Sequence, residues 1–153
     1  MFNIKDKTIL ILIGIPASGK STFYQQYFRD IKVISLDIVK TRNNEDKQLY
    51  DALNSQQSIV IDNTNITINE RHRYINLAKL YHYNIVGIYF QSMVDKSFKR
   101  NELRENKVSK KAILSKAKQL EQPNYDEGFD ELYYVKIENN SFSVSKWNEN
   151  NEI

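Results

Sequence analysis

The sequence contains no cysteine, and its 153 residues include only two histidines, two prolines and four glycines. The absence of cysteine excludes a disulfide scaffold, a thiol nucleophile and any zinc or iron–sulfur site with Cys ligands. His72 and His82 are not spaced as a pair of metal ligands, which argues against a histidine-based metal centre. The low proline and glycine contents exclude Pro-rich and collagen-like chains.

Long apolar runs are also missing. A membrane-spanning helix needs roughly 18 apolar residues, whereas the apolar run Thr8–Ile13 is much shorter. This run follows Asp6, and no small-residue cleavage site comes after it, so it does not fit a signal peptide. We therefore expect no membrane association and a cytoplasmic location.

The overall composition is that of an ordinary globular protein. Hydrophobic residues make up 41% of the chain and charged residues 27%, which allows a buried core. A length of 153 residues suits one compact domain. We predict a single domain over residues 1–153.

Strand-like and helix-like segments alternate along the chain, which predicts an α/β fold with a mainly parallel sheet. Thr8–Ile13 is aliphatic almost throughout, which is typical of a strand buried on both faces. Asn139 and Asn140 predict a turn into a C-terminal hairpin or tail, residues 139–153. The expected strands are Thr8–Ile13, Lys32–Ser35, Ser58–Asp62, Asn84–Phe90 and Glu131–Ile137, and the expected helices are Ser21 to about Phe28, Asp46–Ser55, Asn69–His82, Val94–Glu105 and Lys110–Leu120.

Charge is unevenly distributed although the net charge is only +3. Residues 96–118 carry nine Lys and Arg residues against two Glu, whereas residues 119–153 carry two Lys against eight Asp and Glu. The basic segment favours an anionic partner such as a nucleotide or a nucleic acid. A solvated helix face is the alternative interpretation of the same pattern.

The strongest local signal is a match to the phosphate-binding pattern G-x-x-x-x-G-K-[ST], with a strand before it and a helix after it. Backbone N–H groups around Gly14 and Gly19 are expected to form an anion cradle at the helix N-terminus. Lys20 is expected to reach the β- and γ-phosphates and Ser21 to ligate Mg²⁺. The matching residues are Gly14, Ile15, Pro16, Ala17, Ser18, Gly19, Lys20 and Ser21.

The guanine-binding motif of GTPases, Asn-Lys-x-Asp, is absent. Its nearest approach is Asn106-Lys107-Val108-Ser109, which lacks the acid. A small phosphotransferase is the natural match in size.

Two aspartates are placed to act on transferred phosphate. Asp37 follows the second expected strand, where it would lie beside the γ-phosphate as a general base; capping the next helix is its alternative role. Asp62 ends the third expected strand and could assist Mg²⁺ through water, or be satisfied within its own turn. The polar residues Asn63, Thr64 and Asn65 predict a turn that faces the site.

Arg100 and Arg104 are four residues apart in an expected helix, so both would project from one face. A mobile helical lid over residues 94–118 could close over ATP and place these arginines against transition-state charge. Ordinary surface pairing with Glu102 and Glu105 is the alternative.

These residues together resemble the 5′-hydroxyl polynucleotide kinase family of the phage and eukaryotic repair type. The resemblance runs from about Thr8 to Ile137. Its blocks are the phosphate loop continued through Thr22 and Phe23, Ile61-Asp62-Asn63-Thr64-Asn65 with Arg71, Arg73 and Tyr74 after it, Arg100-Asn101-Glu102-Leu103-Arg104-Glu105, and Gln119-Leu120-Glu121-Gln122-Pro123 followed by Glu127-Gly128-Phe129.

The resemblance implies a P-loop kinase-like three-layer fold with a helical lid, and transfer of the ATP γ-phosphate to a 5′-hydroxyl end of DNA or RNA with Mg²⁺. It places the general base at Asp37 and the phosphate-contacting lid arginine at Arg104, with Arg100 as a second arginine. Lys20, Ser21 and Thr22 fall in the nucleotide site. The residues expected near the acceptor are Lys40, Asn63, Thr64, Asn65 and Arg71.

One departure from the family concerns Lys40. In the phage-type enzymes an arginine three residues after the base helps to hold the 3′-side phosphate of the acceptor. Lysine keeps the charge but loses the bidentate geometry of arginine. Two alternatives therefore stay open: a kinase that acts on a small molecule or, like some toxins, on a sugar nucleotide, and a module that binds ATP without transferring phosphate.

Overall fold

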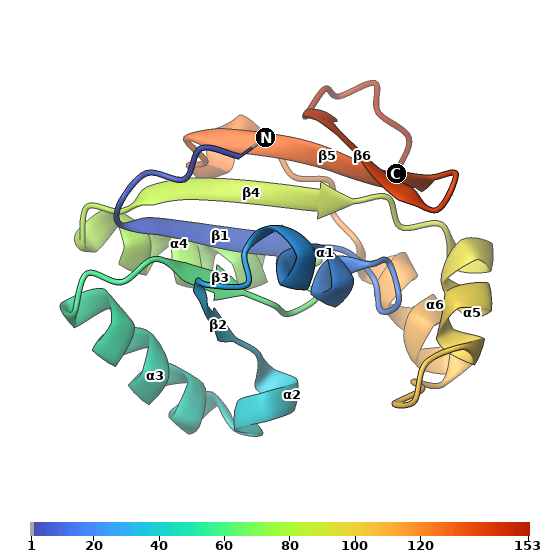
Figure 1. Cartoon of the computed structure of the whole chain (residues 1–153), viewed down its shortest axis with the longest axis horizontal. Coiled ribbons are helices and arrows are strands. Elements are labelled where there is room, and N and C mark those ends of the chain that lie inside the picture. The colour runs from blue at the N-terminus through green and yellow to red at the C-terminus, as the bar shows by residue number, and fades with distance from the viewer. Residues whose placement is uncertain (1) are drawn as a thin grey trace.

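The aliphatic run Thr8–Ile13 forms strand β1, and each of its residues is buried. A computed structural model describes residues 2–153 and places β1 inside a six-stranded sheet (Figure 1). Strand order is β2-β3-β1-β4-β5-β6, and all neighbours are parallel except the β5–β6 pair. The other strands are β2 (Lys32–Ile34), β3 (Ile59–Ile61), β4 (Asn84–Phe90), β5 (Glu131–Glu138) and β6 (Ser141–Lys146).

Alternation along β1 builds two cores, one on each face of the sheet. Ile9 and Ile11 face a core to which α3 and α4 contribute, whereas Leu10 and Leu12 face one that includes Phe23 of α1. The sheet is thus the middle of three layers, as the sequence predicted. The helices are α1 (Lys20–Tyr27), α2 (Leu36–Val39), α3 (Arg42–Asn54), α4 (Ile68–Leu80), α5 (Val94–Glu102) and α6 (Lys110–Gln119), and η1 (Tyr125–Glu127) is a 3₁₀ turn. Within residues 2–153, no helix has both the length and the apolar character needed to cross a bilayer.

Two helices differ from the expected elements: α3 begins at Arg42 instead of Asp46, and α5 ends at Glu102 instead of Glu105. The side chain of Asn101 donates to the carbonyl of Val108 at 2.7 Å and accepts from its N–H at 3.1 Å. These two bonds fold the following loop back onto the helix end, so Arg104 lies in that loop and not on the helix. The short helix α2 and the turn η1 were not expected.

The β5–β6 hairpin packs against the loop that precedes α1. Gly19 of that loop has a φ of +102°, and a Cβ added there would lie 3.1 Å from Cδ1 of Ile137 and 3.2 Å from Cε1 of Phe142. Both the backbone conformation and the close approach of the hairpin therefore require glycine at this position.

Candidate active site

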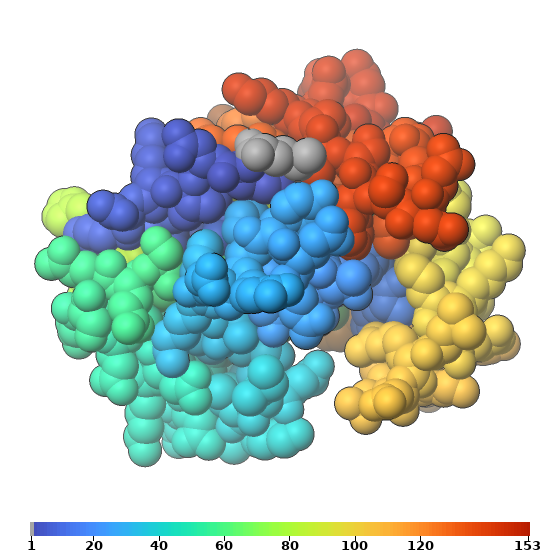
Figure 2. Space-filling model, in the orientation of Figure 1, coloured from blue at the N-terminus to red at the C-terminus, as the bar shows by residue number. Residues whose placement is uncertain are grey.

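The loops at the carboxyl ends of the parallel strands surround a cavity of about 520 Å³, the usual place for ligands in an open α/β sheet. The loops after β1, β2 and β3 face the α5–α6 segment across it. Figure 2 shows the molecular surface hollowed between the α2 region and the α5–α6 region. The lining residues are Pro16, Ala17, Gly19, Lys20, Ser21, Thr22, Leu36, Asp37, Asp62, Asn63, Thr64, Arg100, Arg104, Val108, Ala112 and Lys116.

The phosphate loop is held by bonds from its own lysine and from neighbouring loops. Lys20 Nζ donates to the carbonyls of Gly14 and Ile15, both at 2.9 Å. The N–H of Gly14 donates to the carbonyl of Thr64 at 2.9 Å, and the N–H of Ile15 to Ser92 Oγ at 3.1 Å. The backbone N–H groups of Gly14 and Ile15 thus bond to neighbouring loops of the protein, whereas phosphate contacts were expected around Gly14.

The Lys20 ammonium lies in an electrostatically unusual place. Burial lowers the pKa of Lys20 from its usual 10.5 to about 8. The carboxylate of Asp62 opposes this shift, the guanidinium of Arg104 adds to it, and Asp37 opposes it. Lys20 is therefore a buried cation whose surroundings would be improved by an anionic ligand.

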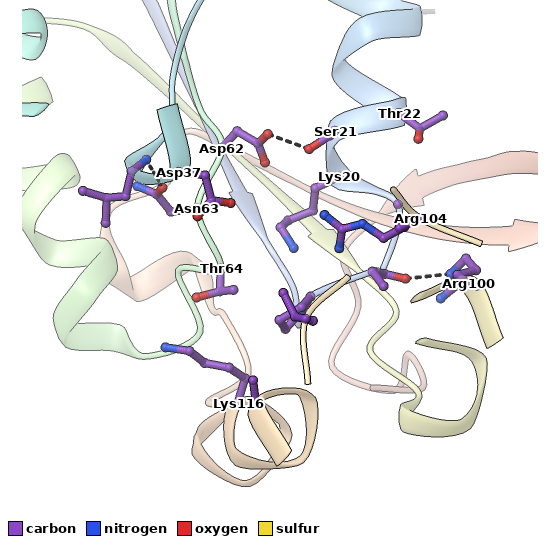
Figure 3. Close-up of a pocket in the computed structure, with 16 residues that line it drawn as sticks. Lys20, Ser21, Thr22, Asp37, Asp62, Asn63, Thr64, Arg100, Arg104 and Lys116 are labelled. Carbon is purple, nitrogen blue, oxygen red and sulfur yellow. Dashed lines mark hydrogen bonds between the residues drawn. The ribbon is translucent and has the colours of Figure 1, made fainter. Parts of the chain in front are cut away.

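Ser21 and Asp62 face each other at the cavity, and Ser21 Oγ donates to Asp62 Oδ2 at 2.8 Å (Figure 3). Burial raises the pKa of Asp62, while the hydrogen bond from Ser21 and the charge of Lys20 oppose the rise. Oxygen ligands on a partly desolvated carboxylate suit Mg²⁺, which commonly takes one or two protein ligands and completes its shell with phosphate oxygens and water. Within residues 2–153, no group of three or more acidic, histidine or cysteine side chains could hold a metal ion by itself. Phosphate oxygens and water would therefore have to supply the remaining ligands.

Asp37 lies in the first turn of α2, is exposed, and lines the same cavity as the phosphate loop. Ser35, and not Asp37, occupies the N-cap position of this helix, so the capping role considered for Asp37 does not apply. The preceding residue is fixed from β3, because the N–H of Leu36 donates to Asn63 Oδ1 at 2.9 Å.

Behind Asn63 lies a buried carboxylate that the sequence did not indicate. Glu45 is 0% exposed, and its Oε2 accepts from Asn63 Nδ2 at 3.0 Å and from the Tyr74 hydroxyl at 2.9 Å. Its other oxygen, Oε1, lies 2.9 Å from an Arg42 nitrogen and 3.1 Å from an Arg73 nitrogen. Arg73 also pairs with Asp46, so this arginine belongs to the network and not to a basic channel.

Arg100 and Arg104 both line the cavity, as expected, but in different ways. Arg100 Nε donates to the carbonyl of Ala17 at 2.7 Å, which ties α5 to the phosphate loop, and burial lowers the pKa of this guanidinium. Arg104 is exposed, and Figure 3 shows it on the Lys20 side of the cavity.

Three residues expected near the acceptor lie elsewhere. Arg71 is 0% exposed and forms a two-point ion pair with Glu127 at 2.7 and 3.1 Å, so its expected contact with an acceptor is wrong. Asn65 is buried and donates to the carbonyl of Leu12 at 2.8 Å. Lys40 is exposed, has a φ of +74° and does not line the cavity. Asn63 and Thr64 do line it.

Comparison with known proteins settles the family. The AAA domain family matches residues 9–123, which include the phosphate loop, Asp37, Arg100 and Arg104. The chain belongs to the AAA domain family. The matched range ends at Pro123 and so includes the whole Gln119–Pro123 block of the polynucleotide kinase resemblance.

Two curated relatives of this AAA domain protein are kinases by name. The bifunctional polynucleotide phosphatase/kinase of Schizosaccharomyces pombe is 29% identical over 147 residues, covering 92% of this chain and 36% of its own length. The L-seryl-tRNA(Sec) kinase of Methanococcus maripaludis is 24% identical over 142 residues, covering 80% of this chain and 56% of its own length. The chain thus spans from about a third to little more than half of these relatives, and the resemblance to polynucleotide kinases is confirmed.

A solved structure has the same fold. Kti12 of Chaetomium thermophilum, in complex with ADP-AlF3, superimposes with a TM-score of 0.66 at 17% identity, covering 84% of this chain and 88% of its own. The six-stranded sheet, the phosphate loop and these relatives identify the AAA domain protein as a nucleotide-binding P-loop domain of the kinase type.

Proposed function

We propose that this protein transfers the γ-phosphate of ATP to a 5′-hydroxyl end of DNA or RNA. The observation that carries the proposal is that one cavity is lined both by Lys20 and Ser21 of the phosphate loop and by the exposed carboxylate of Asp37. A bound triphosphate and a hydroxyl beside Asp37 would meet there. The relative from Schizosaccharomyces pombe supports a nucleic acid as the acceptor.

In this proposal the acceptor oxygen attacks the γ-phosphorus, and the bond from that phosphorus to the β–γ bridging oxygen breaks to release ADP. Asp37 takes the proton of the attacking hydroxyl. Lys20 leaves the carbonyls of Gly14 and Ile15 to bind the phosphates, and Arg104 stabilises the charge that develops on the transferred group. Arg100 holds α5 against the phosphate loop through Ala17.

The Ser21–Asp62 pair is the place where Mg²⁺ would be held, Ser21 directly and Asp62 directly or through water. The ion would neutralise phosphate charge when bound. Because the two side chains already bond to each other at 2.8 Å, they would reach one ion with little movement.

A second candidate is a kinase whose acceptor hydroxyl is not the 5′-hydroxyl end of a DNA or RNA strand. The observation that favours it is the position of Lys40, which follows α2, lies outside the cavity and so leaves the acceptor phosphate without its expected partner. The relative named as a kinase of L-seryl-tRNA(Sec) shows that related chains serve other acceptors. The lid arginines and Asp37 would act in the same way on either acceptor.

Transfer of labelled γ-phosphate from ATP to matched 5′-OH DNA and RNA oligonucleotides, with Mg²⁺, tests the proposal. The wild type is compared with Asp37→Asn and with Asp51→Asn, an exposed aspartate of α3 outside the cavity, as the matched control. We expect label on the product with the wild type and with Asp51→Asn, and none with Asp37→Asn.

The outcomes separate the candidates. ATP binding without label on either oligonucleotide would reject the nucleic acid acceptor and favour the second candidate. Label that persists in Asp37→Asn would remove Asp37 as the base while leaving the acceptor established.

A further inference from the structure

Lys116 lines the cavity but takes no part in the proposed transfer reaction. It lies on α6, is half-buried, and lines the cavity opposite the phosphate loop. It forms no ion pair with any of residues 2–153. An ammonium at the wall of the cavity without an acidic partner is available to form charge-assisted hydrogen bonds with an anionic ligand.

The other cations of the cavity lie with the nucleotide. Lys20 is part of the phosphate loop, Arg100 bonds to the carbonyl of Ala17 in that loop, and the charge of Arg104 acts on Lys20 and Asp62. Among the described residues that line the cavity, Lys116 is therefore the cation left for a second ligand. Figure 3 shows its side chain extending from α6 toward the side of Thr64, away from Arg100.

We propose that Lys116 binds the first internucleotide phosphate of the acceptor, the one on the 3′ side of the nucleotide whose 5′-hydroxyl is phosphorylated. This inference rests on the proposed function. With the hydroxyl beside Asp37, that phosphate is the nearest anionic group of a nucleic acid end. Lys40 cannot meet it within the cavity, because it lies outside the lining. The acceptor end would thus lie between α2 and α6, with the base on one wall and the cation on the other.

Lysine on α6 would also have a consequence for specificity. An ammonium acts as a compact charge without the planar geometry of a guanidinium, so it tolerates several orientations of the phosphate. The site would therefore require an anion at this position more than a particular sugar or base.

The first test compares Lys116→Gln with Lys118→Gln. Lys118 is exposed, lies two residues further along α6 and projects from the opposite side of the helix, so it is the matched control. Lys116→Gln should raise the acceptor KM about tenfold, the size expected for one charge-assisted hydrogen bond, and leave the KM for ATP unchanged. It should also reduce the salt dependence of acceptor binding by about one counterion. Lys118→Gln should match the wild type.

The decisive test changes the ligand as well as the protein. Two 5′-OH dinucleotides are compared, one with the natural phosphodiester and one with an uncharged methylphosphonate in its place. The wild type should lose about tenfold in kcat/KM on the neutral linkage, and Lys116→Gln should lose little more than it has already lost.

An equal further loss in Lys116→Gln would show that the residue does not contact this phosphate, and would overturn the inference while the proposed function stands. No label with the wild type on either dinucleotide or on the matched 5′-OH oligonucleotides would overturn the proposed function itself, and this inference with it. Restoration of the acceptor KM by Lys116→Arg, with the preference for the charged linkage regained, would support the contact.

Discussion

Asn63 Oδ1 accepts a hydrogen bond of 2.9 Å from the backbone N–H of Leu36, and so joins the end of β3 to the start of α2. Asp37 is the next residue along the chain. The amide of Asn63 is itself held by Glu45 at 3.0 Å. The orientation of the proposed base therefore depends on a carboxylate that does not line the cavity.

Asn63→Ala should lower kcat for phosphoryl transfer by about tenfold and leave the KM for ATP unchanged, because the α2 backbone loses its anchor while the phosphate loop does not. The free energy of unfolding should fall by about 1–2 kcal/mol. Steady-state kinetics with urea denaturation measures both, and Asn69→Ala, an exposed position on α4, is the control. A stability loss with unchanged kcat would reduce Asn63 to a structural residue.

Arg104→Ala should lower kcat by a factor on the order of 10²-fold, because its guanidinium is expected to meet charge that develops only in the transition state. Arg100→Ala should act mainly on the KM for ATP, since Arg100 anchors α5 to the phosphate loop. The exposed Arg29, outside the cavity, supplies the control variant Arg29→Ala. Equal kinetics for Arg104→Ala and Arg29→Ala would place Arg104 among ordinary surface residues.

The affinity for ATP should decrease as the pH rises through about 8. Burial puts the pKa of Lys20 at about 8 in the free protein, so above that pH the ammonium increasingly loses its proton. Bound phosphate favours the charged form, and ATP binding must then take up a proton. The Kd should increase by up to about tenfold per pH unit in that range. Titrations with a fluorescent ATP analogue would measure it, and a Kd that stays constant through this range would contradict the prediction. Lys20→Ala should bind weakly at every pH.

Asp62→Asn should raise the Mg²⁺ concentration needed for half-maximal activity by about tenfold, since an amide is a poorer ligand than a carboxylate for this ion. The measurement is a Mg²⁺ titration of phosphoryl transfer at saturating ATP. Asp51→Asn serves again as the control. An unshifted titration would mean that Asp62 only holds the hydroxyl of Ser21.

Arg71→Met should destabilise the fold by about 3–5 kcal/mol, because it leaves the carboxylate of Glu127 buried without a partner. Lys136→Met removes an exposed pair with Glu138 and should change stability little. Urea denaturation compares them, and the double variant Arg71→Met/Glu127→Leu should recover much of the loss. A small effect of Arg71→Met alone would contradict a structural role.

The local features of the site could be predicted from the sequence, whereas its distant pairings could not. The strand Thr8–Ile13, the phosphate loop and Asp62 are each recognised from a few adjacent residues. Glu45 looks like any charged residue of a polar helix, because its partners Asn63 and Tyr74 are 18 and 29 residues away.

The same limit explains the wrong expectations for Arg71 and for the end of α5. The ion pair of Arg71 is 56 residues distant, so the sequence could not separate a buried cation from one that faces a ligand. Helix α5 was expected to continue past its actual end at Glu102, because the hydrogen bonds between Asn101 and Val108 that end it form only once the loop is folded. The basic segment 96–118 was evident, but the orientation of α6 decides which of its lysines reaches the cavity.

The contact of Ile137 and Phe142 with Gly19 ties the nucleotide site to the far end of the chain. Gly19 is where the phosphate loop passes into α1, so the shape of the loop is maintained by side chains that do not line the cavity. Shortening the side chain of Phe142 would increase the conformational freedom of the phosphate loop, and nucleotide binding would then have to restrict it. The hairpin thus supports the phosphate loop, and loss of the Phe142 side chain would weaken nucleotide affinity even where the sheet stays intact.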